Sequence, residues 1–212
     1  MSSKTATDKT PRPRSAERYQ RRRDEVVDIA AHVFAQRGYH ATSIDDLSAA
    51  TGLQRGGLYH YIGGKQELLI RIHERFIEPL LENAREIAAR RESPEVELRL
   101  LAQALIQDIA DYRDQVTVFL HEWRMIEDAP EWKDIRKARK EFEEIIASCL
   151  RRGAKEGIFR PVDERTTMRG FLGMLNYTYQ WLNPRGRITP AAVADSFVDI
   201  FLRGILVDPE RA

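Results

Sequence analysis

The chain has 212 residues, of which 42% are hydrophobic and 32% are charged, and its formal net charge at pH 7 is +1. This composition suits one large folded domain or two smaller ones and argues against a wholly disordered chain. The single cysteine, Cys149, excludes an intramolecular disulfide framework and a zinc site built from cysteines. The longest stretch without charge, between Arg169 and Arg185, is too short and too polar to span a bilayer. Because the first residues contain no apolar segment typical of a secretory signal, we expect a cytoplasmic protein.

Charge is distributed unevenly along the chain. Residues 1–65 contain 11 Lys and Arg but 7 Asp and Glu, whereas the remaining residues contain 23 basic and 26 acidic ones. A basic end is typical of nucleic-acid-binding proteins, and chance variation over a solvated surface is the alternative. Residues 1–16 are rich in Ser, Thr, Lys, Arg and Pro, which predicts a disordered basic arm. Either contact with DNA phosphates or solubility would explain such an arm.

The first helix is predicted to run from near Glu17 to Gly38. Its apolar side chains recur at three- and four-residue spacing and so share one face; they are Val26, Ile29, Ala30, Val33 and Phe34. Gly38 occupies the position where a glycine commonly follows a helix. After a polar break, Ser43 and Asp46 have the spacing of a capping box, which predicts a short helix that ends at Gly52.

The remaining segments are also predicted to be helical. Residues 54–62 form a second short helix, and a long helix runs from Lys65 towards Arg90 with an interruption and kink at Pro79. Another helix begins at Ser93-Pro94, and further helices cover 116–127, 130–152, 163–182 and 189–206. No segment alternates apolar and polar residues as a strand would. The predicted fold class is therefore all-α, with about nine helices.

The two short helices and the tight turn at Thr51-Gly52-Leu53 have the spacing of a helix-turn-helix. In this motif the second helix enters the major groove of DNA. The sequence reads TSIDDL at 42–47 and TGLQRGGLYHYIGGKQEL at 51–68. This pattern resembles the DNA-binding signature of the TetR family of transcriptional repressors. Beyond these residues the chain agrees with the family in length and helical pattern.

The resemblance implies a set of DNA-contacting residues around the second short helix. Thr42 and Ser43 lie at a helix N-terminus, where free amides and a hydroxyl can bind phosphate. Arg55 has the donors to bond guanine O6 and N7, and Gln54 has those that read adenine. The set is completed by Gly57 in the first turn of the recognition helix, by Tyr59, Tyr61 and Lys65 on the DNA backbone, and by His60 on phosphate or base.

Two positions depart from the family pattern. The family usually has Ser or Thr near position 54, where the hydroxyl caps the recognition helix, whereas this chain has Gln54. At position 57 a small hydroxyl residue is replaced by Gly57, which follows Gly56. Because glycine costs a helix about 1 kcal/mol relative to alanine, we expect a recognition helix that DNA orders. Alternatively, Gly57 allows the backbone to approach the groove closely.

By the same resemblance, residues 17–65 form the DNA-binding domain and residues 66–212 form a ligand-binding and dimerisation domain. The last two helices carry apolar stripes that would form a homodimer interface. The interface residues expected from these stripes are Phe171, Leu175, Tyr179, Val193, Phe197, Ile200 and Phe201. The alternative is that both stripes belong to the core of a monomer.

The central helices are expected to hold a small hydrophobic effector. The expected lining residues, each of which ordinary core packing would also explain, are Leu101, Leu105, Phe119, Trp123, Phe142, Ile146, Asn176, Tyr177 and Gln180. Two segments, EGIFRP at 156–161 and WLNPRG at 181–186, resemble those of acyl-CoA-responsive members of the family. The effector would then be a CoA thioester, with its acyl part in the bundle and its phosphates near Arg169, Arg185 or Arg187.

The sequence contains no catalytic constellation that we can identify. The histidines lack metal-ligand spacing, no nucleophile elbow is present, and Cys149 lies on an apolar helix where packing is the expected role. We therefore expect no enzyme and no cofactor, but a homodimeric repressor of a palindromic double-stranded DNA operator. The alternatives are a DNA-binding activator or architectural protein without a small-molecule pocket, and a helical ligand-binding scaffold that does not bind DNA.

Overall fold

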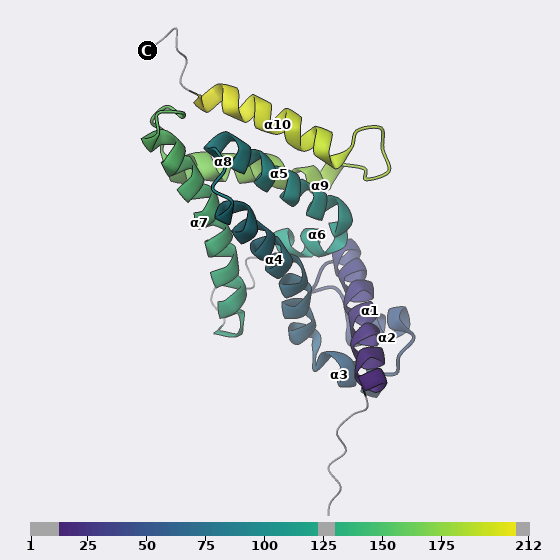
Figure 1. Cartoon of the computed structure of the whole chain (residues 1–212). Helices are drawn as coiled ribbons and strands as arrows, with labels where there is room; N and C mark the ends of the chain where they lie inside the picture. The colour runs from purple at the N-terminus through teal and green to yellow at the C-terminus, as the bar shows by residue number, and fades with distance from the viewer. Residues whose placement is uncertain (1–12, 123–129, 207–212) are drawn as a thin grey trace, which may run out of the picture. The chain divides into compact units, whose positions relative to one another are not determined.

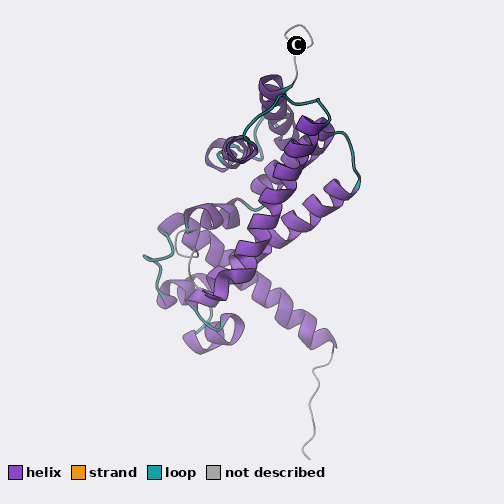
Figure 2. Ribbon diagram, turned by 90° about the vertical axis from the view of Figure 1, so that its left-hand side faces the viewer, coloured by secondary structure: helices purple, strands orange, loops and turns teal. Residues whose placement is uncertain are grey.

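The structure, a computed structural model, describes residues 13–122 and 130–206, with side chains from residue 16 onward. Within these ranges the secondary structure is helical, apart from an isolated antiparallel bridge between Phe159 and Leu206 (Figure 2). The chain divides into two compact units between Leu69 and Ile70, which we call the head and the body. This division lies four residues beyond the expected one at residues 65 and 66.

The head consists of α1 (Pro13–Arg37), α2 (Ile44–Thr51), α3 (Arg55–Ile62) and the first turn of the next helix. The three helices contact one another around a small apolar core. Its members are each at most 2% exposed and include Val26, Ala30, Phe34, Leu47, Leu58 and Ile62. Gly38 and Gly52 adopt left-handed φ angles of 84° and 68°, the conformation in which glycine ends a helix. Both predicted helix ends are therefore confirmed.

Helix α1 begins at Pro13, inside the segment predicted to be a disordered arm. Proline suits the first turn of a helix because its missing N–H has no intrahelical partner there. The start of α1 has exposed side chains at Ala16, Glu17 and Arg18. It therefore has no apolar periodicity from which a helix could be predicted. Residues 1–12 of the predicted arm lie outside the described residues.

Helix α4 (Lys65–Ala89) continues through Pro79, where an interruption is predicted. Proline removes one N–H donor, but the residues on both sides retain helical backbone bonding. In the body this helix buries Ile72, Ile77 and Leu80, each at most 2% exposed. Packing of the apolar face thus maintains the helix across the proline.

The rest of the body contains α5 (Pro94–Asp111), α6 (Arg113–His121), a short 3-10 helix (Pro130–Trp132), α7 (Lys133–Lys155), α8 (Glu164–Asn176), α9 (Thr178–Trp181) and α10 (Pro190–Ile205). Helix α10 lies along α5, which also contacts α7 and α8 (Figure 1). Arg99 of α5 donates to Asp195 (3.1 Å) and Asp199 (2.5 Å) of α10. Helix α5 is therefore central to the body. No helix in the described ranges combines the length and apolar character needed to cross a bilayer.

Three predicted helices of the body differ from the structure. The predicted 130–152 helix is a 3-10 turn (Pro130–Trp132) followed by α7, which extends to Lys155. Helix α6 ends at His121, and residues 123–129 of the predicted 116–127 helix lie outside the described residues. The predicted 163–182 helix is divided at Tyr177 into α8 and α9. Thr178 is fully buried there and its hydroxyl donates to the carbonyl of Leu175 (2.7 Å), competing with regular helical bonding. The predicted helices are otherwise all found in the described residues.

Candidate nucleic-acid interface and ligand cavity

The N-terminus of α2 is closed by the predicted capping box. Ser43 Oγ accepts from the N–H of Asp46 (3.1 Å), and the N–H of Ser43 donates to Asp46 Oδ2 (2.8 Å). Arg37 donates to the other carboxylate oxygen of Asp46 (3.0 Å). The hydrogen bonds from Ser43 hold the pKa of Asp46 below its usual value. The Asp46 carboxylate is therefore committed to the structure of the head.

The two residues predicted at this helix start differ in accessibility. Ser43 is exposed, but its hydroxyl donates to Asp46 Oδ2 (2.6 Å), so it would bond a phosphate only by giving up that bond. Thr42 is 1% exposed, and its hydroxyl donates to the carbonyl of Gly38 (2.8 Å). The prediction for the Thr42 hydroxyl is thus corrected, because the turn after α1 uses it internally. Its backbone N–H donates to the carbonyl of Tyr39 at 3.3 Å.

Helix α3 presents most of the predicted contact residues to solvent. Gln54, Arg55, Tyr59 and His60 are exposed and Gly57 is half-buried, whereas Leu58 and Ile62 fill the opposite face. Gln54 precedes the helix in extended conformation and makes no side-chain cap bond, as its departure from the family pattern implies. The first turn of α3 is therefore open.

Arg55, the predicted reader of guanine, is paired with Asp45 of α2. Its Nε donates to Asp45 Oδ1 (2.5 Å) and its Nη2 donates to Oδ2. The two side chains remain 67% and 64% exposed. The hydrogen bond from Arg55 lowers the pKa of Asp45, and the same bond raises the pKa of Arg55, so both groups are charged at neutral pH. Asp45 is absent from the predicted contact set.

The C-terminal half of α3 is fixed to α1 by aromatic residues. Tyr19 Oη donates to the carbonyl of His60 (2.9 Å), and its ring stacks on Tyr61 with centroids 5.1 Å apart. The ammonium of Lys65 lies 4.3 Å from the ring centroid of Tyr39. Tyr61 and Lys65 therefore also stabilise the head. Tyr19 is not in the predicted set, although its seven-residue spacing from Val26 indicates the same helix face.

The body contains a cavity of about 310 Å³ bounded by residues of α4 to α8. Of the predicted lining residues, Leu105, Phe119, Phe142 and Asn176 contribute to its wall. The wall also contains apolar residues that were not predicted, among them Phe76, Ile77, Met168 and Leu172. Its charged members are Arg139, Glu143 and Arg169, and Arg139 Nε donates to Glu143 Oε1 (3.2 Å).

The other predicted lining residues lie elsewhere. Leu101 and Ile146 are 1% exposed but outside the wall of this cavity. Tyr177 is 64% exposed, and Gln180 is exposed and donates to Tyr179 Oη. Tyr177 lies at the division between α8 and α9, and Gln180 lies in α9. Trp123 lies outside the described residues.

The predicted dimer stripes are used partly inside the chain. Phe171, Leu175 and Val193 are at most 4% exposed and belong to the core, because α8 and α10 pack on α5. The stripe prediction is corrected for these three residues. The other predicted members retain exposure: Tyr179, Phe197 and Phe201 are half-buried and Ile200 is 64% exposed.

Burial raises the pKa values of three acids of the body, Glu97, Asp108 and Cys149. Burial raises the pKa of Cys149 to about 12, and its Sγ donates to the carbonyl of Pro94 (3.3 Å), so the thiol is protonated and packed. Burial, followed by the charge of Asp111, raises the pKa of Asp108 to about 6. Asp108 therefore titrates just below neutral pH.

A helix-turn-helix head with an open recognition helix, joined to a helical body with a cavity, is the arrangement of ligand-responsive transcription regulators. Residues 26–72 match the domain described as bacterial regulatory proteins of the tetR family. Residues 91–205 match the tetracyclin repressor-like C-terminal domain. The chain belongs to the TetR family of transcriptional regulators.

Relatives of known name resemble most of the chain. The HTH-type transcriptional repressor KstR2 of Mycobacterium tuberculosis is 28% identical over 185 residues, which are 87% of this chain and 92% of the relative. The structure of the ketosteroid transcriptional regulator KstR2 from that organism has a TM-score of 0.83 at 28% identity, covering 88% of this chain and 96% of the other. AibR in complex with isovaleryl coenzyme A and operator DNA has a TM-score of 0.75 at 27% identity, covering 84% and 97%. The chain is thus a homologue of TetR-type transcriptional repressors.

Proposed function

We propose that the chain is a ligand-released repressor that binds a palindromic operator as a homodimer, and that regulation rather than catalysis is its activity. The observation that carries the proposal is the exposed first turn of α3, where Gln54 and Arg55 stand clear of the apolar core. Recognition helices read base edges with their N-terminal residues, and this is the end that α3 leaves open. The proposed contact set also includes Ser43, Gly57, Tyr59, His60, Tyr61 and Lys65.

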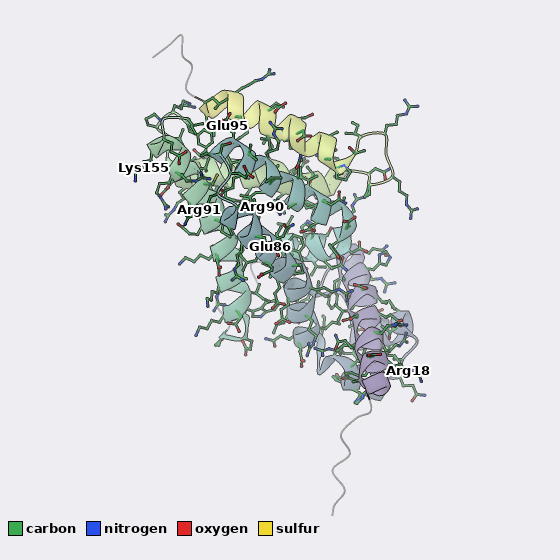
Figure 3. The ribbon with its side chains drawn as sticks, in the orientation of Figure 1. Arg18, Glu86, Arg90, Arg91, Glu95 and Lys155 are labelled. Atoms are coloured by element: carbon green, nitrogen blue, oxygen red, sulfur yellow. The ribbon has the colours of Figure 1, made fainter. Side chains whose placement is uncertain are left out.

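We assign DNA binding to residues 17–65 and ligand binding and dimerisation to residues 66–212. Residues 17–65 carry 7 Lys and Arg against 6 Asp and Glu, and most of the basic surplus of residues 1–65 belongs to residues 1–16. Arg18 is exposed on α1 and belongs to the basic surplus of the N-terminal part (Figure 3). In the body, acids and bases are interleaved where α4 ends, α5 begins and α7 ends, as Figure 3 shows for Glu86, Arg90, Arg91, Glu95 and Lys155. A mixed patch attracts phosphates weakly, so we assign backbone contact to the head.

The body cavity supports an effector with a small hydrophobic part. Its volume of about 310 Å³ is at the lower end of ligand sites, and nine of the fourteen residues that line it are apolar. This volume suits the acyl part of a thioester, whereas the larger CoA moiety would lie outside the cavity. Arg169 is exposed and contributes to the wall, so it could meet a phosphate there. The relative AibR, whose structure contains isovaleryl coenzyme A, supports this class of effector.

The outer surface of α8 to α10 supports a dimer. Tyr177, Trp181 and Ile200 expose 64%, 46% and 64% of their surface, and large apolar side chains exposed to this extent favour association. A Cβ built on Gly173 or Gly204 meets no described atom within 4 Å, so a second copy could approach these helices closely. Two-fold dimers of this kind reach half-sites about 34 Å apart along DNA.

The proposal is tested by selecting binding sites from a pool of random DNA duplexes and measuring mobility shifts on the selected site. We expect a palindromic site, a shift that Arg55→Ala with Tyr59→Ala abolishes, and release by an acyl-CoA but not by free CoA. Failure to select any site would contradict DNA binding and favour a ligand-binding scaffold. Binding that no acyl-CoA changes would favour an activator or architectural protein without this pocket.

A further inference from the structure

Asp45 occupies a position in the head that the capping of α2 does not explain. The cap is made by Ser43 and Asp46, and the Asp46 carboxylate also accepts from Arg37 (3.0 Å). The Asp45 carboxylate faces Arg55 instead, across the turn that joins α2 to α3. Ten residues separate the two positions in sequence, so only the helix-turn-helix geometry brings them together.

The pairing leaves one edge of the Arg55 guanidinium for another acceptor. Arginine has five N–H donors in a rigid plane. Asp45 takes the Nε donor and one donor of Nη2, which form the side edge. The end edge, made by Nη1 and the second donor of Nη2, has the spacing that bonds guanine O6 and N7 together.

We propose that Asp45 is a positioning residue that holds Arg55 for end-on recognition of guanine and thereby sets operator specificity. This inference rests on the proposed function of the head as a DNA reader. An unpaired arginine at an exposed helix start has many rotamers and binds phosphates of any sequence. The Asp45 carboxylate restricts those rotamers and cancels the charge, so Arg55 contributes less to sequence-independent attraction. Base recognition through the two remaining donors is retained.

Asp45→Asn keeps the size of the residue but removes the charge. We expect affinity for non-specific DNA to rise, with the slope of log K against log salt steeper by about 0.9. We also expect the ratio of operator affinity to non-specific affinity to fall by about 10-fold. Glu25→Gln is the matched control, because it removes a carboxylate of the same unit that pairs with Arg22 (2.8 Å) rather than with α3. It should change both affinities by the same factor and leave the ratio unchanged.

A modified base in the operator distinguishes a positioning role of Asp45 from a purely structural one. Replacing the contacted guanine of the selected operator by 7-deazaguanine removes N7, and wild type should lose about 10-fold in affinity. Asp45→Asn should lose only about 3-fold, because Arg55 no longer depends on that geometry. Equal losses in both proteins, or an affinity ratio that Asp45→Asn leaves unchanged, would overturn the positioning role while DNA binding itself stands. If wild type selects no duplex at all, the proposed function fails, and this inference fails with it.

Discussion

Gly56 and Gly57 lie in the first turn of α3, and the packing of the head does not require them. A Cβ built on Gly56 meets no described atom within 4 Å, and one built on Gly57 lies 4.0 Å from the Leu53 side chain. Neither residue has the positive φ that favours glycine. Because each glycine costs a helix about 1 kcal/mol relative to alanine, Gly56→Ala with Gly57→Ala should stabilise the free protein by up to about 2 kcal/mol.

The same double substitution should weaken operator binding. If the bare backbone of this turn approaches the groove closely, two added methyl groups overpack the interface at about 1–3 kcal/mol, or about 5- to 150-fold in affinity. Urea denaturation without DNA measures the first effect, and fluorescence anisotropy with the selected operator measures the second. Gly52→Ala is the control: it has equal space, but its φ of 68° should make alanine destabilising by about 1–2 kcal/mol. Stabilised variants that bind the operator as tightly as wild type would refute close approach.

Asp108→Asn should stabilise the protein at pH 7.5 by about 1 kcal/mol, because the raised pKa of about 6 means that folding disfavours the charged carboxylate. This difference should shrink as pH falls from 6 towards 4, and urea midpoints that differ equally at pH 7.5 and 4.5 would contradict it. Gly153→Ala should destabilise by about 1–3 kcal/mol, since the added Cβ would lie 2.2 Å from the ring of Phe159; an unchanged thermal midpoint would argue against this clash. Because proline cannot donate a backbone hydrogen bond and so weakens the helix, we expect Pro79 to act as a hinge in α4; Pro79→Ala should then alter operator affinity or its response to acyl-CoA, and titrations that match wild type in both would contradict a hinge.

The head is predictable from sequence because its signals are local. The capping box at Ser43, the left-handed Gly52 and the apolar spacing from Val26 to Phe34 each specify a conformation within a few residues. The same logic placed Gln54 and Arg55 at the start of α3. Local signals do not predict the pairing of Arg55 with Asp45, because side chains ten residues apart meet only when two helices have packed.

The body is less predictable because an apolar stripe on a helix does not specify whether another helix of the same chain or a second copy packs on it. Phe171 and Val193 belong to stripes that fit a dimer face and a core equally well, and contact with α5 decides for the core. Tyr177 was expected to line the cavity on the assumption of one continuous helix, and the buried hydroxyl of Thr178 divides that helix. A single polar side chain thus redirects residues that periodicity alone assigns to the interior.

The bond from Tyr19 to the carbonyl of His60 secures only the far end of α3, while its near end has no side-chain cap. In the proposed function, anchorage therefore falls to one end of this eight-residue helix and recognition of bases to the other. Substitutions at Gln54 or Arg55 can accumulate with little cost to folding, so descendants of this protein can acquire new target sites while their architecture stays the same.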